Sequence, residues 1–386
     1  MMSIADRRGR GRKLRRAAAI LTGAVLLAAA TLGGCAPALQ PMGDRVAQPA
    51  VAADGFRTAD GLVLPLRSWL PEGRPRAAIL GLHGFNDYSN TFTEAGAYWA
   101  RHGVATYAFD QRGFGATPNR GIWPGMDTMH ADLFDAAAAI RERHPGVPVF
   151  LLGHSMGGAV VMTALAEHGL PPGVEGAILA APAVWSRDTM PFYQRAALTV
   201  GSWTVPWLEM TPPKGVRRYA SDNIEMLRAM GRDPQVIKAT RVDAVWGLTN
   251  LMDEAMEAVP KVAGPVLVLY GDNEDILPAE PVNRALSSFR TDAAGPDVAV
   301  YPQGWHMLLR DLNAEVVWRD VLSWIGDRDA PLPSGADKRP RRIPVREGRP
   351  PLPQQTAGAE PPAAAGSVTP VGSIVGGGAD GNGQGQ

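Results

Sequence analysis

One serine in the chain stands in a setting where a serine can act as a nucleophile. The sequence Gly-His-Ser-Met-Gly at residues 153–157 follows an apolar run, residues 147–152, and precedes residues 159–167, which have helical apolar spacing. A buried strand, a tight turn flanked by glycines and a helix would hold Ser155 in strained backbone geometry at the carboxyl edge of a sheet. We therefore expect Ser155 to be a nucleophile for acyl transfer rather than an idle residue of a glycine-rich turn.

A serine nucleophile needs a general base, and the base needs an acid to orient it. On a doubly wound sheet the three residues follow one another in the chain order serine, acid, histidine. Among the seven histidines of the chain, only His306 lies beyond a plausible acid. It follows a short predicted strand, residues 298–301, and precedes a closing amphipathic helix, residues 312–325, so we expect His306 to be the base.

The acid is expected in the loop that reads Gly-Asp-Asn-Glu-Asp-Ile-Leu-Pro at residues 271–278. In loops of this kind the acid usually stands third after the glycine, in the pattern Gly-x-x-Asp-x-apolar-apolar-Pro. Alignment on Gly271 and Pro278 places Glu274 at that position, although aspartate is the commoner residue there. Asp275 is the alternative, and the sequence leaves both open.

The oxyanion of a tetrahedral intermediate needs two hydrogen-bond donors. One is expected from the backbone N–H of Met156, the residue after the nucleophile. The other is expected from the backbone N–H of Phe85, in the His-Gly-Phe turn that ends the predicted strand at residues 77–82. We expect His83 to support that turn, and the glycines of residues 110–115, Asp-Gln-Arg-Gly-Phe-Gly, to serve architecture.

Strands and helices alternate along most of the chain, which predicts an α/β fold with a mostly parallel central sheet covered by helices on both faces. Strands that end at one edge of such a sheet would bring the three distant segments together. The predicted strands are residues 62–70, at the sheet edge, 77–82, 104–109, 147–152, 175–181, 265–270 and 298–301, and the predicted helices are 91–102, 132–143, 159–167, 279–289 and 312–325.

Two regions break this alternation. Residues 184–262 show no strand signal and are too long for a connection, so we expect a helical cap inserted into a core of residues 55–183 and 263–328. The seven aromatic residues of the cap are expected to pack its own core. Residues 329–386 are expected to be a disordered tail, because residues 331–386 hold ten Pro, eleven Gly and no aromatic residue.

The N-terminus has the composition of a secretory signal. Seven Arg or Lys lie within the first sixteen residues, and residues 17–34 carry no charge. Cys35, the only cysteine, follows Leu-Gly-Gly and resembles the lipobox of bacterial lipoproteins, although a membrane-spanning anchor is the alternative. We expect a signal peptide over residues 1–34, lipid on Cys35 and a tether over residues 35–54.

The expected location is the bacterial cell envelope, at the outer membrane and facing the periplasm, because Ala36 rather than aspartate follows Cys35. Lysine plus arginine and aspartate plus glutamate each number 38, so no global charge points to nucleic acid. The partners we expect are a small lipid substrate and a membrane surface reached through the lipidated N-terminus.

Over residues 55–326 the chain resembles the α/β-hydrolase fold and, within it, the monoacylglycerol lipases and lysophospholipases. The resemblance rests on residues 153–158, 83–84, 110–115, the loop from Gly271 and Asp233-Pro234. It implies hydrolysis of a single-acyl-chain ester such as a monoacylglycerol or lysophospholipid through an acyl-enzyme, with no metal and no organic cofactor.

Three other functions fit parts of the same pattern. Serine aminopeptidases share these motifs but need acidic groups to bind a free amino terminus, and cofactor-free haloperoxidases use the same triad, usually without such a cap. A catalytically dead envelope scaffold would lack a triad residue, and none is missing. The acids that could bind an amine are Asp222, Glu225, Asp243, Asp253, Glu254 and Glu257.

Overall fold

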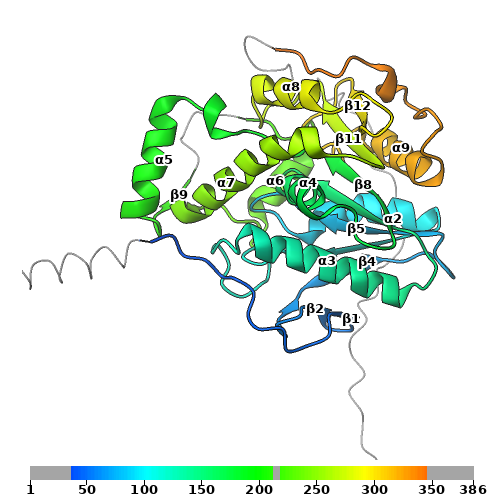
Figure 1. The fold of residues 1–386 in the computed structure, drawn as a ribbon, viewed down its shortest axis with the longest axis horizontal. Coiled ribbons are helices and arrows are strands. Elements are labelled where there is room, and N and C mark those ends of the chain that lie inside the picture. Colours follow the sequence, from blue (N-terminus) through cyan, green and yellow to red (C-terminus); the bar gives the residue numbers. More distant parts are fainter. Residues whose placement is uncertain (1–35, 212–217, 346–386) are drawn as a thin grey trace, which may run out of the picture.

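The computed structural model describes residues 36–211 and 218–345. Seven strands of this part form one sheet, in which β4 pairs antiparallel to β6 and every other neighbouring pair is parallel (Figure 1). This confirms the predicted fold class and the edge position of β4. In order across the sheet the strands are β12 (Asp297–Tyr301), β11 (Val266–Gly271), β8 (Val174–Ala180), β7 (Val149–His154), β5 (Ala77–Leu82), β6 (Val104–Phe109) and β4 (Leu66–Trp69).

Helices cover both faces of the sheet, which is why its central strands are apolar without alternation. All six residues of β5, β6, β7 and β11 are buried. Side chains that alternate along each strand divide into two apolar clusters, one on each face. Helices α3 (Met126–Arg143), α4 (Met156–His168) and α8 (Ala279–Ser288) pack on one face, and α2 (Thr93–Arg101) and α9 (Ala314–Gly326) on the other.

The predicted cap segment, residues 184–262, is only partly separate from this body. Its last helix, α7 (Val242–Ala258), has ten buried residues and packs along α4. Its first helix, α5 (Phe192–Thr204), stands away from the body with Ser202 as its one buried residue (Figure 1). The segment also contains α6 (Ile224–Arg232) and a two-stranded ribbon of β9 (Glu209–Met210) and β10 (Thr240–Arg241) that the sequence analysis did not foresee.

The prediction that the cap aromatics pack a core of their own is wrong for the aromatic residues of α5 and the turn after it. The solvent-exposed fractions are 76% for Phe192, 59% for Tyr193, 60% for Trp203 and 51% for Trp207. A single helix standing over an open cavity offers these side chains no second layer to pack against.

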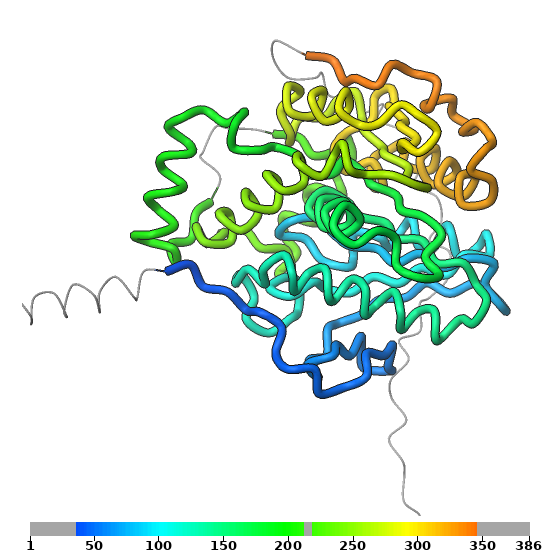
Figure 2. The backbone as a smooth tube through the Cα atoms, viewed as in Figure 1, coloured from blue at the N-terminus to red at the C-terminus, as the bar shows by residue number. Residues whose placement is uncertain are grey.

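The prediction of a tether over residues 35–54 is wrong for the described residues 36–54, which lie along the body (Figure 2). The backbone N–H of Gln40 donates to the carbonyl of Trp123 at 3.0 Å, and that of Met42 to the hydroxyl of Thr128 at 3.0 Å. Absence of a clear apolar period does not prevent such pairing, because backbone donors bond in any sequence. The segment then enters a small antiparallel sheet of β1 (Ala50–Ala52), β2 (Gly55–Arg57) and β3 (Val63–Leu64).

The prediction of a disordered tail over residues 329–386 is wrong for residues 329–345, and the rest lies outside the described residues. Leu332, Ala336 and Ile343 are at most 5% exposed. The Asn283 side chain exchanges two hydrogen bonds with the backbone of Ile343, at 2.9 and 2.8 Å. The average composition of the tail concealed three apolar residues spaced so that each reaches the body.

Replacing Ile343 by alanine should lower the free energy of unfolding by about 2 kcal/mol or more, because it removes buried methyl groups and leaves a cavity. Val345→Ala is the matched control: this side chain is 79% exposed, and its loss should cost less than about 0.5 kcal/mol. Urea denaturation measures both values. Equal stability of the two variants would contradict the packing of this segment on the body.

Candidate active site

Ser155 lies at the turn between β7 and α4 with φ 53° and ψ −115°, a conformation that non-glycine residues rarely adopt. Glycines on both sides make the turn possible. A Cβ at Gly157 would lie 2.2 Å from the carbonyl oxygen of Leu82, and one at Gly153 would lie 2.3 Å from that of Gly157. The strained backbone places the hydroxyl of Ser155 at the carboxyl edge of the sheet, as the glycine pattern predicts.

His306 and Glu274 join Ser155 in a continuous chain of hydrogen bonds. The Nε2 atom of His306 lies 2.9 Å from the Oγ of Ser155, and its Nδ1 lies 2.7 Å from the Oε2 of Glu274. The carboxylate accepts a hydrogen bond from the Nδ1–H group of His306. The proton of the neutral ring is therefore on Nδ1, and the lone pair of Nε2 faces the serine hydroxyl. This arrangement can take the proton from Ser155 as the hydroxyl attacks a carbonyl carbon.

The structure places Glu274, rather than Asp275, against His306. The Oε1 atom of Glu274 accepts the backbone N–H groups of Ile276 and Leu277, at 2.8 and 2.9 Å, which leaves Oε2 for the imidazole. Asp275 points elsewhere: its Oδ2 accepts the backbone N–H of Tyr219 at 2.9 Å, and its Oδ1 pairs with Arg218 at 3.0 Å. The glutamate's extra methylene is thus accommodated by the loop.

The two expected oxyanion donors adjoin the serine. Met156 is the first residue of α4, and within the described part of the chain neither its backbone N–H nor that of Phe85 has an acceptor. A Cβ at Gly84 would lie 3.3 Å from the Cβ of Ser155, so the turn that carries Phe85 lies against the nucleophile. Both N–H groups are therefore available to a developing oxyanion.

His83 supports this turn from beneath. Its Nδ1 donates to the carbonyl of Gly84 at 2.8 Å, and its Nε2 accepts the backbone N–H of Gln111 at 2.9 Å. Complete burial lowers the pKa of His83, so the ring is neutral at pH 7. The segment that carries Gln111 is itself held by Arg112, which pairs with Asp60 and Asp132, both at 2.7 Å.

His306 is held in place by His154 and Asp311, two residues to which the sequence analysis assigned no role. The Nε2 atom of His154 lies 3.0 Å from the carbonyl oxygen of His306, and burial lowers the pKa of His154 to about 3, so the ring is neutral and donates. Asp311 accepts the backbone N–H of Trp305 at 2.7 Å. No sequence signal marks these contacts, because the direction of a buried side chain depends on packing.

A cavity of about 990 Å³ opens from Ser155 between the body and α5. Few of its wall side chains are polar, and most of the remainder are aliphatic, aromatic or methionine; the polar ones are Asp87, His154, Ser155, Gln194, Thr249 and His306. Such a cavity can take up one long apolar chain with its polar end at Ser155. Apolar wall residues include Trp185, Met190, Leu198, Val205, Val245 and Leu248.

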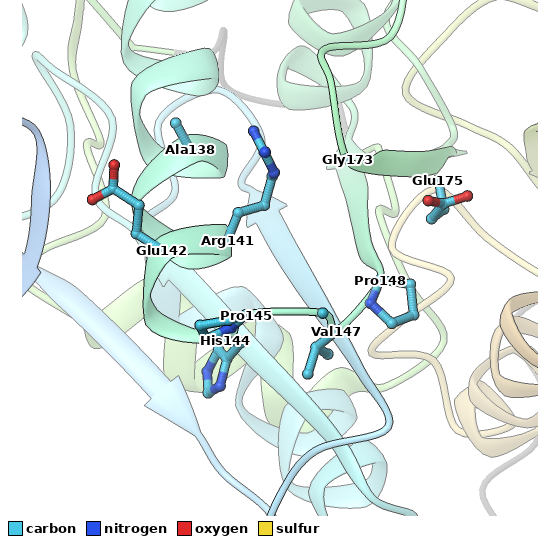
Figure 3. Close-up of a pocket in the computed structure, with 10 residues that line it drawn as sticks. Ala138, Arg141, Glu142, His144, Pro145, Val147, Pro148, Gly173 and Glu175 are labelled. Carbon is cyan, nitrogen blue, oxygen red and sulfur yellow. The ribbon is translucent and has the colours of Figure 1, made fainter.

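A second hollow, of about 600 Å³, lies at the amino end of β7, away from the triad (Figure 3). Figure 3 shows Arg141, Glu142 and His144 at the end of α3 and Glu175 across from them. None of its lining residues is a serine, threonine or cysteine. This hollow therefore lacks a nucleophile, and the larger apolar cavity is the candidate active site.

Glu274→Gln should lower kcat for an activated ester about 10³- to 10⁴-fold. The two backbone N–H groups would hold the amide oxygen, so the amide NH₂ would face Nδ1 and favour the imidazole tautomer that carries its proton on Nε2. Asp275→Asn, an equally conservative change in the next residue, should leave kcat within a few-fold. Steady-state hydrolysis of p-nitrophenyl butyrate measures both, and a larger loss in Asp275→Asn would transfer the acid's role to that residue.

Comparisons with known proteins agree with this geometry. Human monoglyceride lipase is 25% identical over 277 residues, which cover 70% of this chain and 89% of the lipase. A monoacylglycerol lipase of Mycolicibacterium smegmatis is 24% identical over 283 residues, covering 70% and 95%. Among solved structures, the monoacylglycerol lipase of Paleococcus ferrophilus superimposes with a TM-score of 0.55 at 22% identity, covering 68% of this chain and 98% of that one.

A family model matches residues 73–313, which include every residue of the triad and both oxyanion donors. Its description is "Serine aminopeptidase, S33", under the family name Hydrolase_4. The match spans well over half of the chain. The chain therefore belongs to this serine aminopeptidase S33 family of the α/β-hydrolase fold.

Proposed function

We propose that the protein hydrolyses the ester of a single-acyl-chain lipid, such as a monoacylglycerol or a lysophospholipid, through an acyl-enzyme. Ser155 attacks the ester carbonyl while His306 takes its proton, and the imidazolium that forms is stabilised by Glu274. The backbone N–H groups of Phe85 and Met156 stabilise the oxyanion. His306 then gives its proton to the leaving alcohol, and a water molecule activated by the same ring releases the fatty acid.

The apolar cavity at Ser155 carries this proposal. An acyl chain buried there gains about 0.8 kcal/mol for each methylene removed from water. The family relatives support the same substrate class, since several of them are named monoglyceride lipases.

An aminopeptidase would need a carboxylate at the cavity to bind a free amine. None of the six acids that the sequence offers for this role lines the cavity. Asp243 is paired with Arg241, and Asp253 with Arg187. Asp87 is the one carboxylate among the described lining residues, and the guanidinium of Arg310 lies 3.6 Å from it. The cavity wall thus favours a lipid over a peptide amine.

Among p-nitrophenyl esters, kcat/KM should rise with acyl length by up to about fourfold per methylene until the cavity is filled. Aminoacyl anilides should be poor substrates. Ala197 lines the cavity from α5, whereas the adjacent Ala196 does not. Ala197→Trp should therefore lower kcat/KM for long esters and spare the acetate, and Ala196→Trp should change neither.

Labelling by a fluorophosphonate probe distinguishes an active hydrolase from a scaffold without activity. The folded protein should react with a fluorophosphonate probe, and Ser155→Ala should abolish the labelling. Labelled protein that prefers aminoacyl anilides would instead be a peptidase, and folded protein that is never labelled would be a scaffold.

We propose further that Cys35 carries lipid and that the protein is attached to the outer membrane, facing the periplasm. Cys35 lies outside the described residues, and among the described residues no helix is both long and apolar enough to cross a bilayer. The described chain starts beside the cap: the backbone N–H of Ala38 donates to the carboxylate of Asp243 at 3.1 Å. Asp243 in turn donates its own N–H to the carbonyl of Pro206 at 3.0 Å.

This placement supports a membrane contact of the cap itself. Two residues lie between Cys35 and Ala38, so the three Cα–Cα steps from one to the other reach at most about 11 Å. Ala38 and Trp207 are linked through Asp243 and Pro206, so a lipid on Cys35 would enter the bilayer near the exposed side chains of α5. Large apolar side chains that are exposed to water along one segment indicate a contact surface. Those exposed to at least 49% outside the cavity lining are Phe192, Val200, Trp203 and Trp207, and Tyr193, Leu208 and Met210 are exposed at the cavity wall.

Cys35→Ser should move the protein from the membrane fraction to the soluble fraction, because exposed side chains alone bind a bilayer more weakly than acyl chains do. Fractionation of cells that express each form measures the shift. A variant that stays in the membrane fraction would contradict lipidation of Cys35.

A substitution in α5 tests the proposed contact of this helix with the membrane. Trp203→Ser should keep the protein in the membrane fraction and lower the hydrolysis of monoacylglycerol embedded in vesicles, with hydrolysis of a soluble short ester unchanged. Val345→Ser, an exposed side chain far along the chain, should change neither rate.

A further inference from the structure

A cluster of three metal-ligand side chains lies where α3 and α4 pack together, outside the active site. His130 comes from α3, and Glu167 and His168 end α4. One possible ligand atom from each residue lies within 4.8 Å of the others. The Oε2 atom of Glu167 is 3.7 Å from the Nδ1 of His130 and 3.6 Å from the Nε2 of His168. These separations are too long for hydrogen bonds.

The hydrogen bonds of His130 determine which of its nitrogens carries the proton. Its Nε2 lies 2.8 Å from the hydroxyl of Thr163. That hydroxyl donates its single proton to the backbone carbonyls of Ala159 and Val160, at 2.9 and 3.1 Å, so it must accept from Nε2. The neutral ring therefore has a bare lone pair on Nδ1.

The lone pair on Nδ1 is buried and has no hydrogen-bond partner. His130 is 3% exposed, and its Nδ1 is a buried polar atom without a partner. A lone pair that faces a carboxylate oxygen, with nothing positive between them, is unfavourable.

The third ligand is held in place by its neighbours. The ring of His168 lies edge-on to His130 and to Phe134, with centroids 5.8 and 5.6 Å apart. Glu167 is half exposed, so its carboxylate can move toward both imidazoles. A cation that reaches the site from solvent would meet two nitrogens and one oxygen.

We propose that His130, Glu167 and His168 form a binding site for a divalent transition-metal ion such as zinc. Two imidazoles and a carboxylate are a common zinc ligand set, with water in the fourth position. Ligand atoms about 2.0–2.2 Å from a tetrahedral ion lie about 3.3–3.5 Å apart, which needs only a small closure of the exposed side chains. Thr163 would act as the outer partner that fixes the tautomer of a ligating histidine.

The proposed metal site lies at the far end of α4 from Ser155, and the proposal does not depend on the proposed hydrolase activity. Helix α4 begins at the residue after Ser155 and ends at His168, about 18 Å farther along its axis. A bound ion would join the end of α4 to the start of α3. It would stabilise the folded chain in proportion to its affinity and would leave the triad untouched.

Calorimetric titration of chelator-treated full-length protein with zinc chloride should show one site. Glu167→Gln and His168→Ala should each weaken zinc binding at least tenfold. His102→Ala removes an exposed histidine at the end of α2, whose Nδ1 lies 2.8 Å from the carbonyl oxygen of Tyr98, and this variant should bind zinc as the unchanged protein does. Cobalt(II) provides a second readout, because a tetrahedral site with these ligands has visible absorption bands that His168→Ala should abolish.

Zinc should also raise the thermal unfolding temperature of the unchanged protein and of His102→Ala, but not of His168→Ala. Both altered ligands lie at the surface, so their variants should fold, and hydrolysis of a short ester verifies this. Absence of stoichiometric zinc binding, or equal zinc binding by His168→Ala, would overturn the proposal and leave Glu167 as a surface carboxylate beside two imidazoles.

Discussion

The arrangement of the active site depends on the carboxylate of Glu274. Two backbone N–H groups donate to one of its oxygens, and the other oxygen accepts a hydrogen bond from the Nδ1–H group of His306. That bond fixes the imidazole tautomer, which in turn directs the Nε2 lone pair at Ser155. The three residues come from loops that follow β11, β12 and β7, and parallel strands end at the same edge. The parallel order of the sheet is therefore what makes the catalytic geometry possible.

The strained backbone of Ser155 is sustained by the surroundings of the turn. Residues in sparsely populated conformations cost about 1–3 kcal/mol and persist only where neighbours determine them. Here the N–H of Ser155 donates to the carbonyl of Ala180 at 2.9 Å, and its own carbonyl accepts from Ala159 and Ala183, both at 3.0 Å. The strand before the turn is fully buried, so it cannot shift to relax the strain. Stability of the central sheet thus maintains the reactive position of the hydroxyl.

Sequence reasoning predicted the features that follow from chain order and local pattern. The fold class and the positions of Ser155, His306 and Glu274 all derive from short motifs between strong periodic elements. It failed where the outcome depends on distant packing. Residues 36–54 and 329–345 lie along the body because isolated apolar side chains and backbone groups find partners there, which average composition does not reveal. The support that His154 gives to His306 depends on a side-chain direction, and spacing alone does not determine that direction.

Helix α5 carries apolar side chains on two of its faces. Ala197 and Leu198 look into the cavity, while Phe192, Val200 and Trp203 lie on the outer side in water. An apolar face of a helix is normally buried against other protein. In this chain one side covers the acyl-binding cavity, and the other has no protein layer over it among the described residues. A lipid surface on the outer side would remove these side chains from water, and it would place the cavity where a single-chain lipid can pass from the bilayer to Ser155. The same helix would then account for both the apolar cavity and the exposed patch.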